Sequence, residues 1–470
     1  MVRYYWPSRR IPPYGVGHAR CSGWYDLELA THKRHHTTRA ILAIVALGAA
    51  WPALAFHSGG VADCEGCHSM HNSFEGAAAT TAQAQFTAGA YLLKGSDSSS
   101  VCLHCHEAAG VPVPRAYFVS TSTQDLTPGA PPRQLTPGGD FGWLKKTYTW
   151  APLGGAAQTS LGELHGHSVI ALEYGYQIDG AHATAPGGTY PSSSLSCVSC
   201  HDPHGRYRRI AGGTVVATGL PIVDSGSYDT SPDPVADTWA VGAYRLLGGL
   251  GYQPKSLGAG FAFSNGPPDA VSPFVYNRSE ATTQTRVAYG RGMSEWCANC
   301  HPGMLRAGYT ADMGGLNHPV GNDARLSPGF QTNYVAYVRT GSLANVDPTR
   351  AYWSLVPFEE GSANYATLRS HARVDDTSLG GPDSNSTVSC LTCHRAHASG
   401  FDGSLRFRAG NNFITVPDAG GSPVWPDPAL APAEAQGRTA VETQQAYYGR
   451  PASQFAPYQA PLCNKCHVKD

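Results

Sequence analysis

The sequence predicts a chain of mostly irregular loops, with short helices and few short strands. Among its 470 residues are 54 Gly and 35 Pro, and only 14% of its residues are charged. Backbone with this much conformational freedom is costly to order. No stretch keeps a helical period of apolar residues, and turn signals recur instead, as in Thr136-Pro-Gly-Gly-Asp140. Something besides a large aliphatic core must therefore hold the chain together.

The cysteines indicate what that is. Twelve of the 13 cysteines fall in six copies of the pattern C-x-x-C-H, where a random order of these residues would give roughly 0.015 copies. The cysteine pairs are Cys64 and Cys67, Cys102 and Cys105, Cys197 and Cys200, Cys297 and Cys300, Cys390 and Cys393, and Cys463 and Cys466. The histidines that end motifs 1 to 6 are His68, His106, His201, His301, His394 and His467.

This motif is typical of covalently attached haem. Two sulfurs separated by two residues reach the two vinyl groups of one haem, and the histidine that follows lies under the iron as its proximal ligand. Zinc sites use C-x-x-C pairs without needing a histidine after each. A thioredoxin-like site would occur once, and disulfides would not place a histidine after every second cysteine. We therefore predict six haem c groups, each with one iron.

Each iron needs a second axial ligand. Residues 56–470 contain four methionines, too few for six irons, but ten histidines beyond the six proximal ones. Bis-histidine ligation is therefore expected, which leaves no iron position open for a substrate and lowers the reduction potential relative to His/Met ligation.

Three distal candidates follow a proximal histidine by three residues, in the pattern C-x-x-C-H-x-x-H: His71, His204 and His397. Three residues span at most about 10 Å, so such a histidine cannot easily reach the opposite face of its own haem. We expect it to ligate a different haem close by. Further candidates are His167, His318 and His371, which could return from loops, and His57, just before motif 1; His104, His165 and His182 are weaker.

Residues 1–55 differ from the rest of the chain. They carry seven Lys and Arg against two acids, then an apolar stretch that ends in Ala53-Leu54-Ala55. This predicts a secretory signal peptide cleaved before Phe56. The alternative, a retained membrane anchor, is less favoured because the apolar run is short and interrupted. The region before Thr31 is long for a leader, which a misassigned start codon would explain.

Residues 56–470 are expected to form a single continuous hexahaem domain, because the haem motifs run almost from end to end. With 26 basic against 32 acidic residues this part is acidic, even before the haem propionates are added. It has no basic tract, so nucleic acid is not an expected partner. Short helical turns are expected after the motifs.

The run from Phe56 to Ser73 closely resembles the mature start of the outer-membrane hexahaem cytochrome S family of metal-reducing bacteria. The resemblance covers essentially all of 56–470, with all six motifs in order. Residues 1–55 do not share it, and 302–317 diverge. Its main segments are 136–143, 199–205, 251–256, 281–301, 393–402 and 456–467.

The resemblance implies bis-histidine haems, little regular secondary structure and polymerisation into filaments with haems stacked along the axis. It also implies that His71 ligates the fifth haem of the neighbouring subunit, whose proximal ligand is His394. Seven distal candidates then match six places (His57, His71, His167, His204, His318, His371 and His397), so one is left over.

The function expected is extracellular electron transfer, by the subunit of a polymeric conductive filament that delivers electrons to external acceptors such as metal oxides or partner cells. Other cytochromes are expected partners, and the route is secretion through the periplasm to the cell surface or beyond. The alternative is a non-polymeric periplasmic or surface electron shuttle. A multihaem reductase is disfavoured because every motif ends in histidine and spare histidines are plentiful.

Overall fold

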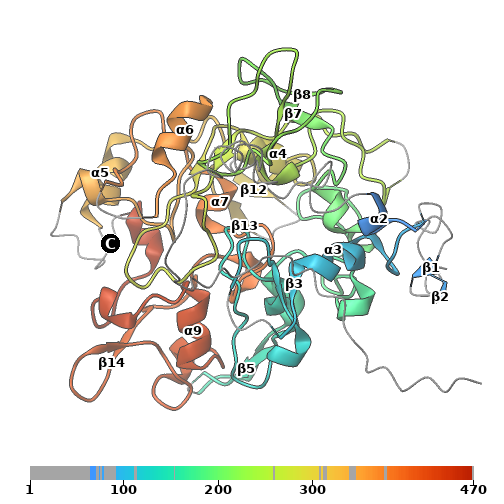
Figure 1. Cartoon of the computed structure of the whole chain (residues 1–470). Helices are drawn as coiled ribbons and strands as arrows, with labels where there is room; N and C mark the ends of the chain where they lie inside the picture. Colours follow the sequence, from blue (N-terminus) through green and yellow to red (C-terminus); the bar gives the residue numbers. More distant parts are fainter. Residues whose placement is uncertain are drawn as a thin grey trace, which may run out of the picture. The chain divides into compact units, whose positions relative to one another are not determined.

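In the computed structural model (Figure 1), short helices, single helical turns and two- or three-residue strands are joined by long loops. The expected boundary between residues 55 and 56 lies outside the described residues. Those are 64–69, 73–74, 77–78, 92–110, 114–152, 154–257, 260–305, 308–310, 315–337, 346–374 and 378–467.

The helices are short, which confirms the prediction made from the sequence. The longest described ones, α3 (Ser98–His106) and α5 (Pro328–Ala336), have nine residues each. None of the described helices is long and apolar enough to cross a bilayer. The other α-helices are α2 (Cys64–Cys67), α4 (Met293–Cys297), α6 (Tyr365–His371), α7 (Cys390–Cys393), α8 (Pro432–Ala435) and α9 (Ala440–Ala446).

Single 3-10 turns (η) interrupt the loops between these helices. They are η3 (Thr123–Asp125), η4 (Phe141–Lys145), η5 (Gly162–His165), η6 (Leu172–Tyr174), η7 (Ser192–Ser194), η8 (Cys197–Ser199), η9 (Tyr244–Leu246), η10 (Pro302–Leu305), η12 (Pro348–Arg350), η13 (Asp402–Ser404), η14 (Ala452–Gln454) and η15 (Leu462–Lys465).

The strands are two or three residues long and form small sheets. The largest described sheet has the order β8-β7-β9, with β7 (Tyr207–Arg209) antiparallel to both β8 (Val215–Ala217) and β9 (Val241–Gly242). The other antiparallel pairs are β1 (Ser73–Phe74) with β2 (Ala77–Ala78), β5 (Tyr148–Trp150) with β6 (Gln158–Ser160), β10 (Ala270–Val271) with β11 (Ala288–Tyr289), β12 (Gly308–Thr310) with β13 (Gly315–Asn317), and β14 (Val416–Pro417) with β15 (Pro423–Val424); β3 (Glu107–Ala108) and β4 (Ser120–Thr121) are parallel.

Helical turns were expected after the haem motifs, and among the described residues that prediction holds directly only at motif 4, where η10 (Pro302–Leu305) follows His301. The turns include the motif cysteines themselves, because the backbone N–H of the motif histidine donates to the carbonyl of the first cysteine. This α-turn bond measures 2.8 Å at His68, 3.0 Å at His201, 3.1 Å at His301, 2.9 Å at His394 and 3.0 Å at His467. After the histidine the chain leaves the helical turn, except at motif 4, where η10 follows.

The main core is aromatic rather than aliphatic. Its largest cluster includes Trp353, Tyr337 and Tyr447, each at most 1% exposed, with Phe455 and Trp425 packed nearby. Trp353 and Tyr337 meet edge to face at 5.9 Å between centroids, whereas Trp425 and Tyr447 stack at 4.7 Å. Such pairs add about 0.5–1.5 kcal/mol beyond the area they bury. Aromatic packing therefore offsets part of the cost of ordering so many loops.

Buried arginines join these loops from within. The Arg450 guanidinium, 0% exposed, donates to the Glu280 carboxylate at 2.8 Å and to the Gln284 side-chain oxygen at 2.7 Å. The Ser354 hydroxyl accepts from the same guanidinium and donates to Glu280. One charged centre thus fastens three loops that are far apart in the sequence.

We expect Glu280→Ala to lower the free energy of unfolding by about 3–5 kcal/mol, because it leaves the Arg450 charge buried without a counter-ion. Chemical denaturation followed by far-ultraviolet circular dichroism measures this. The matched control is Asp233→Ala. Its carboxylate is 74% exposed in the pair with Arg369, so its effect should stay below about 1 kcal/mol. Equal effects of the two substitutions would contradict the role given to the buried network.

A candidate array of haem-binding motifs

The twelve motif cysteines are available for attachment. All twelve are free thiols, and each is exposed or half-buried. Free cysteine is among the residue types most often buried, so twelve thiols left partly open are unusual. Thioether attachment of haem to all six motifs requires such openness.

The six motifs follow one another in space in their chain order, since the thiols of each consecutive pair of motifs lie close together. The Cys102 and Cys197 side chains are hydrogen-bonded, and so are those of Cys297 and Cys390. The other three junctions are within electrostatic range: Cys67 with Cys102, Cys200 with Cys300, and Cys393 with Cys466. The attachment points thus form a continuous array through the chain.

Backbone carbonyls orient the proximal imidazoles. In four of them Nδ1 lies against a carbonyl oxygen, so that Nδ1 carries the proton and Nε2 is the basic nitrogen. This is the usual arrangement of a metal-binding histidine. The distances are 2.6 Å from His106 to Tyr117, 2.6 Å from His201 to Arg245, 2.9 Å from His301 to Pro186, and 2.6 Å from His394 to Gly403.

Burial keeps these imidazoles neutral. It lowers the pKa of His301 to about 4, helped by His167, and the pKa of His397 to about 3, helped by His201. The pKa values of His106, His167 and His394 are also lowered, chiefly by burial. Neutral imidazole is the form that binds metals.

Four motif histidines each face a second histidine. The ring centroids are 6.4 Å apart for His68 and His204, 6.3 Å for His201 and His397, 6.0 Å for His301 and His167, and 6.0 Å for His467 and His318. A metal–imidazole bond is about 2 Å long, so two imidazoles on opposite sides of one metal have their centres roughly 6–6.5 Å apart. The paired rings therefore fit the two axial ligands of a haem iron, whose other four ligands the porphyrin supplies.

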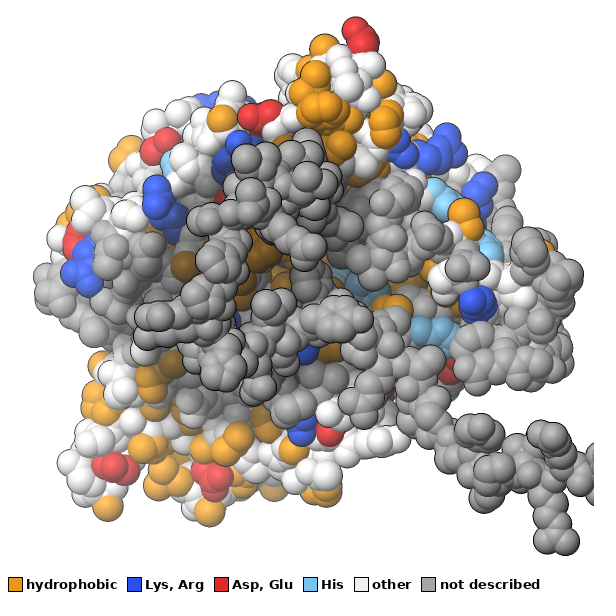
Figure 2. Space-filling model, viewed as in Figure 1, with side chains coloured by type: hydrophobic (Ala, Val, Ile, Leu, Met, Phe, Trp, Pro, Cys, Tyr) orange, Lys and Arg blue, Asp and Glu red, His pale blue; other side chains and the backbone are white. Residues whose placement is uncertain are grey.

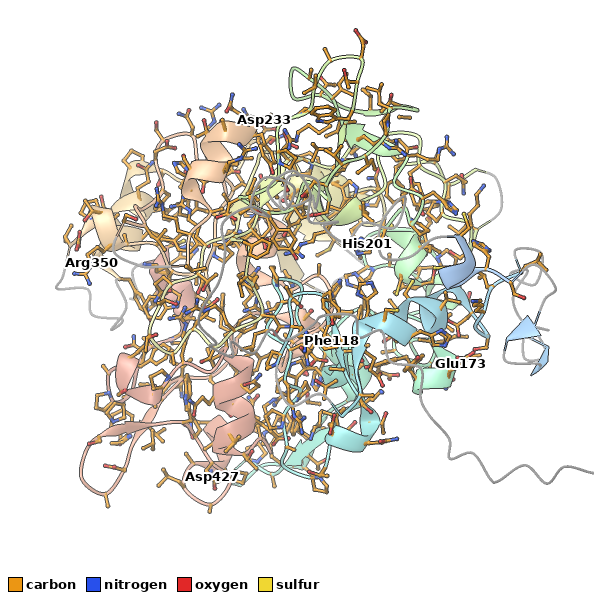
Figure 3. All side chains as sticks on the ribbon, in the orientation of Figure 1. Phe118, Glu173, His201, Asp233, Arg350 and Asp427 are labelled. Atoms are coloured by element: carbon orange, nitrogen blue, oxygen red, sulfur yellow. The ribbon has the colours of Figure 1, made fainter. Side chains whose placement is uncertain are left out.

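The spacing argument is consistent with these pairs. His204 lies three residues after His201 but faces His68, and His397 lies three residues after His394 but faces His201 (labelled in Figure 3). Each of these histidines thus meets the proximal histidine of another motif. Several histidine side chains are open on the right of the space-filling view (Figure 2).

The weaker candidates have other partners. The His165 ring contacts the Ser160 hydroxyl through Nε2 at 2.8 Å and the Trp143 carbonyl through Nδ1 at 2.9 Å, so both its nitrogens are engaged by protein. His104 lies 3.3 Å from Glu173 through Nε2, and His182 lies 3.5 Å from Asp179. His371, one of the seven main candidates, contacts Glu360 through Nδ1 at 3.1 Å. His57 and His71 lie outside the described residues.

Motifs 1, 3 and 5 share a support that sequence reasoning missed. The residue after each proximal histidine donates its N–H to Leu92, Leu246 or Ser404, at 2.7 Å in every case. Two residues beyond each acceptor, Lys94, Gly248 or Arg406 donates back to the second cysteine, at 2.9, 2.9 and 2.7 Å. Leu92, Leu246 and Ser404 all have positive φ, of 52°, 56° and 56°. Only a leucine directly after each of them signals this turn in the sequence.

Comparisons with known proteins relate most of this chain to one cytochrome. No family model matches the chain. The chain is 54% identical to the C-type cytochrome OmcS of Geobacter sulfurreducens over 433 residues, which cover 92% of this chain and 98% of that protein. Its structure resembles that of OmcS nanowires from the same organism, solved by cryo-EM, with a TM-score of 0.80 and 54% identity over 88% of this chain and all of the other.

A second solved structure, the outer membrane cytochrome S filament from the same organism, matches with a TM-score of 0.80 and 53% identity, again over 88% of this chain and all of that one. The predominance of loops is thus shared with an experimentally determined fold. The identity and coverage establish homology, and this chain belongs to the family of the C-type cytochrome OmcS.

Proposed function

We propose that this chain is a hexahaem c-type cytochrome that carries electrons out of the cell, as the subunit of a polymeric conductive filament. The observation that carries the proposal is the continuous array of six motifs, in which every junction brings two attachment thiols together. Bound haem supplies reversible one-electron chemistry at each motif. The chain's part is to hold those groups close together and to fill both axial positions, so that it acts as a conductor and not as an enzyme.

Four irons would be held by the facing pairs His68 with His204, His201 with His397, His301 with His167, and His467 with His318. His106 and His394 then need partners from among His57, His71 and His371. The likeness to OmcS supports His71 as the ligand opposite His394 of a neighbouring subunit. His57 or His371 would complete the site of His106, and the other would be the histidine left over.

Polymerisation is supported by two findings. The similar structures are those of nanowires and filaments. Motifs 1 and 6 also end the array within one chain, so head-to-tail contact would continue it across subunits, as heterologous interfaces do in open filaments. The electrons would leave through external acceptors such as metal oxides or partner cells, and enter from other cytochromes.

The location proposed is the cell surface or the extracellular space. Residues 1–55 would serve as the signal peptide for secretion through the periplasm, and residues 56–470 would form the single hexahaem domain. The alternative is a non-polymeric shuttle, in which His71 would find a haem within its own chain.

Intact-mass measurement of the purified protein should show six covalent haems. The double variant Cys197→Ser and Cys200→Ser removes both attachment sulfurs of motif 3 and should carry five. The matched control is Ser199→Ala, inside the same motif, which should keep six. A wild-type mass that corresponds to fewer than six haems would reject the proposed site.

His167→Ala should leave one iron without its sixth ligand and produce one high-spin haem that binds carbon monoxide. His165→Ala, two residues away, should leave every haem low-spin, because His165 is already held by Ser160 and Trp143. Visible absorption and electron paramagnetic resonance distinguish the two variants. A large high-spin fraction in the wild-type protein would instead favour a reductase.

Wild-type protein purified from the cell surface should form filaments in electron cryo-microscopy. His71→Ala should shorten or abolish them and should leave one haem per subunit open to carbon monoxide, because that residue would join neighbouring subunits. Protein that stays monomeric under all conditions would refute the filament and leave the shuttle.

A further inference from the structure

Two buried serines connect separate motifs. Ser99 in α3 stands three residues before Cys102, and Ser294 in α4 stands three residues before Cys297. The Ser99 hydroxyl accepts the backbone N–H of Cys197 at 3.0 Å, and the Ser294 hydroxyl accepts the backbone N–H of Cys390 at 3.1 Å. Ser99 is 0% exposed and Ser294 is 1% exposed. Each serine therefore bonds an even-numbered motif to the start of the next odd-numbered motif.

The attachment thiols also meet at the same two junctions. Cys102 is hydrogen-bonded to Cys197, and Cys297 is hydrogen-bonded to Cys390. The accepted N–H groups belong to the first residues of η8 and α7, and such helix-start donors have no partner within their own helix. The serines thus satisfy buried donors immediately beside the sulfur atoms to which two different haems would attach.

A buried carboxylate fixes the helix that carries each serine. Asp97, 4% exposed, accepts the N–H of Ser100 at 2.7 Å at the start of α3. Glu359, 0% exposed, accepts the N–H of Met293 at 3.0 Å and that of Ser294 at 3.3 Å at the start of α4. The two junctions are thus built alike, although their sequences share little beyond the serine.

The third even-numbered motif provides an internal contrast. Three residues before Cys463, where motifs 2 and 4 have serine, motif 6 has Ala460. No motif follows motif 6 within residues 1–470. Among the even-numbered motifs, the serine thus occurs in the two that a further motif follows.

We infer that Ser99 and Ser294 are positioning residues that lock motif 2 to motif 3 and motif 4 to motif 5, and so fix the distance and relative orientation of the two haems in each pair. The inference rests on the proposed loading of six haems. It goes beyond the proposed function because it divides the six motifs into two rigidly held pairs, 2 with 3 and 4 with 5, and leaves motifs 1 and 6 outside them. A serine that served stability alone would leave haem–haem orientation unchanged.

The experiment compares Ser99→Ala and Ser294→Ala in the full-length, haem-loaded protein. Its readout is the Soret circular dichroism couplet, which arises from electronic coupling between neighbouring haems and depends on their mutual orientation. The matched control is Ser100→Ala, because Ser100 is equally buried in the same helix but its hydroxyl donates to Asp97, at the start of that helix, and not to another motif. Intact mass is recorded for each variant.

We expect loss of couplet amplitude in both alanine variants with six haems retained, and an unchanged couplet in Ser100→Ala. An unchanged couplet in Ser99→Ala and Ser294→Ala, or an equal loss in Ser100→Ala, would overturn the inference. If Ser99→Ala loads fewer haems, the couplet of Ser294→Ala decides on the same criterion. Fewer than six haems in the wild-type protein would instead reject the proposed function itself.

Discussion

The hydrogen bond from a motif histidine to the carbonyl of its first cysteine is the local constraint on which the arrangement of this chain depends. It closes one α-turn, which brings two sulfurs to one side and ends the helix at the histidine. In four motifs the imidazole then leaves the turn and is oriented from outside, by a carbonyl of a loop against Nδ1. A motif of five residues thus presents two cysteine sulfurs and one imidazole nitrogen to a haem, and other parts of the chain supply the second imidazole.

Such a chain needs little regular secondary structure. Its loops are ordered by groups that bind several carbonyls at once, because unsatisfied buried backbone groups are costly. Lys465, between the cysteines of motif 6, illustrates this: its ammonium group donates to the carbonyls of Tyr334, Tyr337 and Ala351 and is 0% exposed. Long cationic side chains thus satisfy the buried carbonyls of these loops, as hydrogen bonds between strands do in folds built on sheets.

The sequence predicted the motifs, the loops and the role of the C-x-x-C-H-x-x-H spacing because each depends on neighbouring residues. It did not predict which distal histidine faces which motif, since His68 and His204 meet only through the fold. The left-handed turns at Leu92, Leu246 and Ser404 were also hidden, because leucine and serine do not favour positive φ and a following leucine is too common to mark the turn. The serine links escaped notice for the same reason: a serine is common, and its partner is about 100 residues away.

Crossed pairing of histidines has a consequence for biogenesis. Under the proposed ligation, motif 1 receives its second imidazole from motif 3, and motif 3 receives its own from motif 5. If the chain is secreted as proposed, an iron attached at His68 would lack its second imidazole until residue 204 has also been delivered. The incomplete chain would pass through a stage in which some irons have an exchangeable axial position. During maturation these irons would need protection from external ligands, which the finished protein no longer requires.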